Sequence, residues 1–266
     1  EVKSVDKPTW KEIDGKRYRL TKSYRTERYA GMYTTIILAD TTLKVDDKTY
    51  TIDNEGVATE FTAKNQFVRD DNWNWYYYDA DGKFLTGRQT IDGVQLYFDG
   101  TGKQIKGERT LIDGKYYYFD KNSGELLRNA FHSFSSSYKL YFGNDGAQVF
   151  GWYTLDGHRV YFKEDGLQAK DKVLSIDGNY YYFNQDGQLL VNGSAKSYNS
   201  LYLADSEGKL LSGWREIDGK TYYLDPSEKH YYYNRTASID GKTYLFGSYA
   251  ELLRNDSNYA YASDEN

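Results

Sequence analysis

Hydrophobic and polar positions alternate in short aromatic segments along most of the chain, and Asp-Gly pairs separate these segments. One segment reads YYYF at 116–119 and follows Ile112-Asp113-Gly114. An Asp-Gly pair between alternating segments predicts a two-residue β-hairpin turn. Because the side chains of a strand point alternately to opposite faces, Tyr117 and Phe119 are predicted to share one face. A looser turn ending in Gly and a short return strand, such as 125–128, are expected to complete each unit.

The same pattern recurs along the chain with a short period, of about 21 residues, which is typical of repeat architectures. Three units make a longer repeat, because LYFDGTGKQIKGERTLIDGKYYYFDKNSGELLRN at 96–129 aligns without a gap with VYFKEDGLQAKDKVLSIDGNYYYFNQDGQLLVNG at 160–193. A single two-stranded hairpin is marginally stable in water, whereas stacked hairpins bury their faces against one another. We therefore predict an all-β fold, a β-solenoid of stacked β-hairpin repeats of about 21 residues. The apolar residues that open the Asp-Gly turns are Ile13, Ile91, Ile112, Leu155, Ile176, Ile217 and Ile239.

Three parts are expected along the chain. Residues 1–72 read as an irregular N-terminal β region with degenerate repeat units, and 73–255 as the regular solenoid. Residues 256–266 read as a frayed tail. Within the first part, Ala58 to Asp71 reads as a connector, and no stretch predicts an amphipathic helix.

Composition narrows the possible functions. The chain has 30 Tyr and one Met among 266 residues, which favours many small aromatic cores over one aliphatic core. The absence of Cys excludes disulfides and thiolate metal sites. A net charge of −5 without a basic stripe disfavours nucleic acid, and no apolar run reaches the roughly 18–20 residues of a membrane span. The opening EVKSVDKPTW is not a signal peptide, and we expect the chain to be part of a larger protein.

The Asp and His residues, which could in principle be catalytic, have simpler structural explanations. Nearly every Asp falls in a predicted turn, where its short side chain sets the turn geometry. His132, His158 and His230 stand at unrelated places in their repeats, so they predict neither a metal site nor a catalytic triad. We therefore expect a binding module rather than an enzyme, with no cofactor and no metal. The turn aspartates are Asp92, Asp113, Asp156, Asp177, Asp218 and Asp240.

The most informative polar pattern is a Gln-x-Lys step, found as Gln104-Ile105-Lys106 and as Gln168-Ala169-Lys170. Positions two apart on a strand point the same way, so the Gln amide and the Lys ammonium are expected on one face. Beside an aromatic strand, their donors and acceptor would suit the hydroxyls of a sugar ring. A solvated return strand explains the pattern equally well. In the third long repeat Tyr231 and Tyr233 take these places, so a site there is expected to be lost or altered.

The repeats also carry a resemblance. The segments YYYDADGKFLTGRQTIDGVQLYFD, GWYTLDGHRVYFKEDG and IDGNYYYFNQDG resemble cell-wall-binding repeats of lactic-acid bacteria and streptococci, and more closely the glucan-binding repeats of glucansucrases, over about residues 73–254. The resemblance implies a β-solenoid outside a catalytic domain, with sugar pockets that combine a stacking Tyr, a Tyr-x-Phe strand and a Gln-x-Lys step. Carried over by position, the glucan-binding residues are Gln104, Lys106, Tyr117 and Phe119 in one pocket and Gln168, Lys170, Tyr181 and Phe183 in the other.

The resemblance implies a secreted or cell-surface module that binds α-glucan or isomalto-oligosaccharide and retains a glucansucrase on its polymer. The alternatives are a choline- or peptidoglycan-binding anchor and a toxin-type receptor-binding repeat array. A choline cage needs several aromatic rings around the cation, Trp above all. The chain has five Trp, and a Lys in the pocket would repel choline, so the sequence favours glucan.

Overall fold

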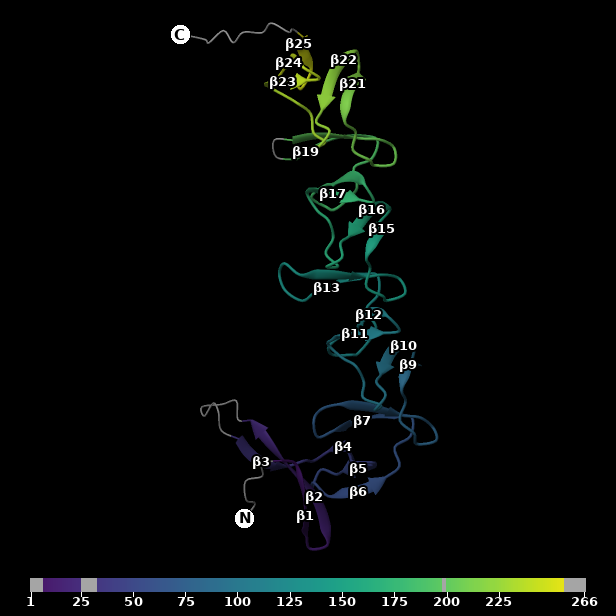
Figure 1. The fold of residues 1–266 in the computed structure, drawn as a ribbon. Coiled ribbons are helices and arrows are strands. Elements are labelled where there is room, and N and C mark those ends of the chain that lie inside the picture. The colour runs from purple at the N-terminus through teal and green to yellow at the C-terminus, as the bar shows by residue number, and fades with distance from the viewer. Residues whose placement is uncertain (1–6, 25–32, 198–199, 256–266) are drawn as a thin grey trace. The chain divides into compact units, whose positions relative to one another are not determined.

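The computed structural model describes residues 7–24, 33–197 and 200–255 (Figure 1). These residues form strands and turns, which confirms the all-β prediction, and among them no helix is long and apolar enough to cross a membrane. The chain divides into two compact units, one of residues 1–130 and 142–148 and the other of residues 131–141 and 149–266. The expected tail at 256–266 lies outside the described residues.

The N-terminal strands of the first unit form two sheets. One has the order β1-β2-β3, and the other has the order β6-β5-β4-β7-β8, in which β4 and β7 are parallel. The strands are β1 (Thr9–Ile13), β2 (Lys16–Tyr24), β3 (Tyr33–Ile37), β4 (Thr41–Val45), β5 (Lys48–Ile52), β6 (Ala58–Phe61), β7 (Gln66–Asp70) and β8 (Trp75–Tyr78).

The expectation of a connector from Ala58 to Asp71 is wrong, because this stretch supplies β6 and β7 to the five-stranded sheet. β6 pairs with β5, and β7 pairs with both β4 and β8. Val68 is fully buried, and the Phe67 ring lies 4.9 Å from the Tyr77 ring. The parallel pairing of β7 with the distant strand β4 outweighs the weak local pattern.

Beyond β8 the chain is a series of short antiparallel hairpins joined by turns, and it ends in a three-stranded sheet of order β23-β24-β25 (Figure 1). The strands are β9 (Gly87–Ile91), β10 (Val94–Phe98), β11 (Arg109–Ile112), β12 (Lys115–Tyr118), β13 (Ala130–Ser133), β14 (Lys139–Phe142), β15 (Gly151–Leu155), β16 (His158–Phe162), β17 (Lys172–Ile176), β18 (Asn179–Phe183), β19 (Gly193–Ser197), β20 (Ser200–Ala204), β21 (Gly213–Ile217), β22 (Lys220–Leu224), β23 (Arg235–Ile239), β24 (Lys242–Phe246) and β25 (Leu252–Asn255).

The Asp-Gly pairs form the hairpin turns, as predicted. Asp113 has φ 51° and Gly114 has φ 76°, so both central residues adopt the left-handed conformation of a type I′ turn. Asp and Gly reach this region at little cost, which explains their place between the strands. The other predicted turn aspartates, Asp92, Asp156, Asp177, Asp218 and Asp240, have φ of 51°, 50°, 49°, 49° and 50°.

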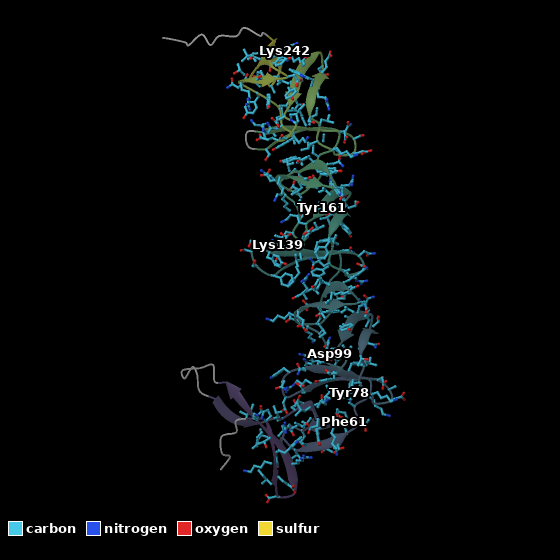
Figure 2. All side chains as sticks on the ribbon, in the orientation of Figure 1. Phe61, Tyr78, Asp99, Lys139, Tyr161 and Lys242 are labelled. Atoms are coloured by element: carbon cyan, nitrogen blue, oxygen red, sulfur yellow. The ribbon has the colours of Figure 1, made fainter. Side chains whose placement is uncertain are left out.

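A second kind of turn follows each aromatic strand. At Asp99 (Figure 2), the carboxylate Oδ1 accepts hydrogen bonds from the backbone N–H groups of Thr101 and Lys103, at 2.8 and 3.0 Å. Asp therefore acts here as a turn former. Within the described ranges, no three His, Asp or Glu residues gather in a way that could hold a metal ion.

The predicted return strand at 125–128 is wrong, since one bridge between Phe119 and Leu126 replaces it. The Leu126 N–H donates to the carbonyl oxygen of Gln95 in the preceding hairpin, at 2.9 Å. This segment therefore divides its hydrogen bonds between two hairpins. In the second copy the bridge joins Phe183 to Leu189, so its turn is one residue shorter and the two copies do not align throughout without a gap.

The core consists of separate small clusters, as the aromatic composition predicts. Four of these clusters bury a phenylalanine at or beside the end of an aromatic strand, and such a ring removes a large apolar area from water. The fully buried phenylalanines are Phe98, Phe119, Phe142, Phe162, Phe183 and Phe246.

Candidate functional site

The first Gln–Lys set consists of Gln104 and Lys106. It lies where the segment that follows the β9–β10 hairpin meets the turn that follows β12. The Gln104 backbone N–H donates to the carbonyl oxygen of Trp75 at 2.7 Å, and its side-chain Nε2 donates to the carbonyl oxygen of Ser123 at 3.2 Å. Lys106 Nζ donates to the carbonyl oxygen of Asn122 at 3.0 Å and lies 5.6 Å from the centroid of the Trp75 ring. The structure therefore brings Gln104 and Lys106 together and adds a ring, Trp75, that the sequence analysis missed.

The polar groups of this set are partly removed from water. The Gln104 side chain is 4% exposed, and because its Nε2 faces a carbonyl oxygen, the other end of the amide is the acceptor. That Oε1 atom is buried, and no donor in the described part of the chain bonds to it. Burial lowers the pKa of Lys106, which the nearby Asp120 carboxylate opposes. Hydrogen bonds from the backbone of Ser123 and Asn122 hold the pKa of Asp120 below its ordinary value.

Tyr117 and Phe119 lie in the core next to this set. They pack with Ile105, the residue between the Gln and the Lys, and are 6% and 1% exposed. The Arg88 guanidinium carbon lies 4.1 Å from the Tyr117 ring centroid. The two rings thus support β12 and the turn that accepts hydrogen bonds from the Gln and Lys side chains.

The second Gln–Lys set consists of Gln168 and Lys170 and repeats part of this arrangement in the other unit. Gln168 Nε2 donates to the carbonyl oxygen of Asp186 at 3.3 Å, so both Gln side chains bond to the residue before a turn glycine. Gln168 is half-buried and Lys170 is exposed, and both line a groove of about 600 Å³. The groove is lined by Phe131, Ser133, Lys139, Leu167, Gln168 and Lys170, with two further serines.

Tyr181 and Phe183 are buried beside the second set, like their counterparts beside the first. They pack with Ala169, the residue between the Gln and the Lys. The Trp152 ring lies 4.9 Å from the Tyr181 ring, in an edge-to-face arrangement. The ring exposed at the second groove belongs to Phe131, which is 42% exposed and was not predicted.

The backbone bonding of Gln104 recurs at other positions, among them Gln148 and Tyr231. Gln148 donates its N–H to Tyr116 at 2.7 Å, and Tyr231 donates its N–H to Leu201 at 2.8 Å. At the first position the Arg109 Nε donates to Gln148 Oε1 at 2.6 Å, and the guanidinium lies 3.4 Å from the Tyr116 ring centroid. At the second, the Tyr231 side chain is 3% exposed and occupies the core.

The comparisons with known proteins agree with these repeats. Residues 85–131 and 149–194 match the family model of a choline-binding repeat, and residues 212–229 match that of a cell wall binding repeat. Glucosyltransferase-S of Streptococcus mutans is 42% identical over 164 residues, which cover 61% of this chain and 11% of that protein. Glucosyltransferase-I of Streptococcus downei is 32% identical over 185 residues, which cover 69% of this chain and 9% of that protein. The chain thus spans about a tenth of the length of these curated relatives.

A solved structure shares the fold. CbpJ from Streptococcus pneumoniae superimposes with a TM-score of 0.59 at 18% sequence identity, covering 92% of each chain. Together with the sequence matches, this confirms the resemblance inferred from the repeats and the β-solenoid prediction. The chain contains cell-wall-binding repeats of the choline-binding type and is homologous to segments of streptococcal glucosyltransferases.

Proposed function

We propose that this chain is a non-catalytic module that binds α-glucan of the dextran type through its two Gln–Lys sets. The observation that carries the proposal is the first set, where the Gln104 amide and the Lys106 ammonium converge on one turn beside the half-buried Trp75 ring. An aromatic face beside directional polar groups matches a pyranose ring, which has an apolar C–H face and a rim of hydroxyls.

The polar groups of the first set match hydroxyls that donate and accept at once. Lys106 uses one N–H on Asn122 and has two others to donate. Gln104 Oε1 is an acceptor without a protein donor in the described part of the chain, and a shift of the side chains that cover it would present it to a sugar hydroxyl. Such a hydroxyl would remove the cost of a buried, unpaired acceptor.

We assign different parts to the other predicted residues. In the second set, Gln168 and Lys170 are proposed to contact the sugar, with Phe131 as the ring. The buried rings Tyr117, Phe119, Tyr181 and Phe183 are proposed to hold the sets in place from the core.

The family description favours a second candidate, a choline-binding anchor. Against it, the chain places its own arginines over three of its five tryptophan rings. The Arg17, Arg69 and Arg159 guanidinium carbons lie 4.2, 4.1 and 4.4 Å from the ring centroids of Trp10, Trp73 and Trp152, respectively. A ring whose face already holds a cation repels a quaternary ammonium, which depends on that same face. We therefore favour a neutral sugar.

The relatives support a proposal about the wider role. Because the matched proteins are named glucosyltransferases, we propose that the chain is a module of a larger glucosyltransferase of the glucansucrase type, secreted or held at the cell surface. Two weak sites on one chain would hold a long polymer by avidity. The module would then keep the enzyme on its growing product.

Native gel electrophoresis with and without soluble dextran tests this proposal. Dextran should retard the chain, whereas choline should leave its mobility and melting temperature unchanged. Gln104→Ala and Gln168→Ala should each weaken the retardation, and the double variant should abolish it with an unchanged circular dichroism spectrum. Retardation that survives in the double variant would move the sites elsewhere. No retardation by dextran together with a clear response to choline would overturn the glucan proposal.

A further inference from the structure

The two Gln–Lys sets differ in one chemically important position. Lys139 occupies the place in the second long repeat that Trp75 occupies in the first, at the same offset along the chain that relates Gln168 to Gln104. Both residues are the first of their strand, β14 and β8. An aromatic ring in the first set is therefore replaced by an ammonium in the second.

The groove around Lys139 gathers donors without a balancing acid. Its lining includes Lys139, Lys170, the Gln168 amide and three serines, and no Asp or Glu. Neither lysine forms an ion pair with any residue in the described ranges, and both side chains are exposed (Figure 2 labels Lys139). Asp186 takes part through its backbone carbonyl oxygen, which accepts a hydrogen bond from the Gln168 side-chain amide.

In the first set, by contrast, an acidic group lies near the cation. There Lys106 is half-buried, Trp75 provides an apolar face, and the Asp120 carboxylate is near enough to act on the pKa of Lys106. One cation is thus partly compensated by an acid in the first set. Two uncompensated cations face one groove in the second, in a chain whose net charge is −5.

We propose that the Lys139–Lys170 groove binds an oxyanion, a carboxylate or phosphate carried on a saccharide or polyol chain. The two ammonium groups bind the anion, the serine hydroxyls and the Gln168 amide bond to the neighbouring hydroxyls, and the exposed Phe131 ring packs against the C–H face of the chain. The inference goes beyond the proposed glucan function, because it adds an anionic group to the saccharide chain that the second set contacts.

The experiment compares dextran with carboxymethyl dextran of equal length, so that the two polymers differ only in carboxylates. The whole chain should bind carboxymethyl dextran about three- to fivefold more tightly at low salt, the range expected for one or two solvent-exposed ion pairs. This preference should disappear at about 0.5 M salt, where screening is strong. The Lys139→Gln variant should lose most of the preference.

Two further variants make the assignment specific. Lys139→Trp, which introduces the residue of the first set, should reverse the preference toward neutral dextran. Lys220→Gln, which removes an exposed lysine of β22 in the same unit, should leave the preference intact. A preference that is absent from the wild type, or that survives in Lys139→Gln, would overturn the proposal.

Inorganic phosphate separates a chain-borne anion from a free one. Failure of about 10 mM phosphate to displace carboxymethyl dextran, at an ionic strength held constant so that screening does not change, would support recognition of the chain together with its charge. Displacement would overturn that part of the proposal. Binding of neutral dextran to the wild type tests the glucan proposal on its own. Carboxymethyl dextran can bind through Lys139 even if neutral dextran does not, so the two proposals can fail independently.

Discussion

The Gln104 amide packs directly against Gly124, so closely that a Cβ atom on this glycine would collide with Gln104 Nε2. Gln168 and Gly187 repeat the relationship in the second unit. The turn glycines therefore have two tasks. They adopt a left-handed backbone conformation, with φ of 75° and 83°, and they leave room for the amide of the preceding repeat.

This packing predicts that Gly124→Ala weakens dextran binding, because the new methyl group displaces the Gln104 amide from the Ser123 carbonyl oxygen. We expect a loss of about fivefold, or about 1 kcal/mol, in titrations on dextran gels. Gly114→Ala is the matched control, since Gly114 has φ 76° but nothing within 4 Å of its Cβ position. Equal losses in both variants would mean that backbone strain, and not the Gln104 position, controls binding.

The small cores predict a large difference between two leucines of the first unit. Leu126 is 6% exposed and packs with Phe119, whereas Leu111 is 57% exposed. Leu126→Ala should lower the free energy of unfolding by about 2–4 kcal/mol and Leu111→Ala by less than about 0.5 kcal/mol. Urea unfolding followed by tyrosine fluorescence measures both. Similar values for the two variants would contradict the assignment of Leu126 to a packed core.

Arg109 should stabilise the first unit through its guanidinium plane. The group stacks on Tyr116 and donates to Gln148, so Arg109→Ala should cost about 1–2 kcal/mol of unfolding free energy. Arg109→Lys should recover little, because an ammonium lacks the planar fork that makes both contacts. A double-mutant cycle with Tyr116→Ala isolates the stacking contribution. A coupling energy near zero would show that the ring contact does not contribute.

Stability should fall in alkaline solution. Desolvation, aided by a hydrogen bond of 3.1 Å to Asp70, raises the pKa of Tyr76 to about 12. The folded state therefore keeps a proton that the unfolded chain releases near pH 10. The stabilising contribution is complete below pH 10 and is lost as the pH rises toward 12.

Melting temperatures measured between pH 8 and 12 test this loss. Tyr76→Phe should have a lower melting temperature at neutral pH and a shallower decline above pH 10. Tyr249→Phe is the control, because the Tyr249 side chain is 80% exposed. An identical decline in wild type and Tyr76→Phe would rule out a contribution from Tyr76.

Sequence alone determined the repeat, the hairpins and their turns. These features depend on neighbours in the chain, because an Asp-Gly pair sets its own backbone conformation and strand alternation sorts adjacent side chains. The type I′ turn at Asp113 and the shared core of Tyr117 and Phe119 follow from such local rules. The Gln-x-Lys step was likewise visible as a pattern.

Tertiary structure decided what lies beside each Gln–Lys set. Gln104 bonds to Trp75, which lies more than one repeat period earlier in the chain, and the return segments at Leu126, Gln148 and Leu189 likewise bond to an earlier hairpin. For the same reason 125–128 forms no strand of its own. Phe131 and Lys139 reach the groove of Gln168 through this packing of one repeat on another. Such contacts depend on how repeats stack in space, and local sequence patterns do not encode that stacking.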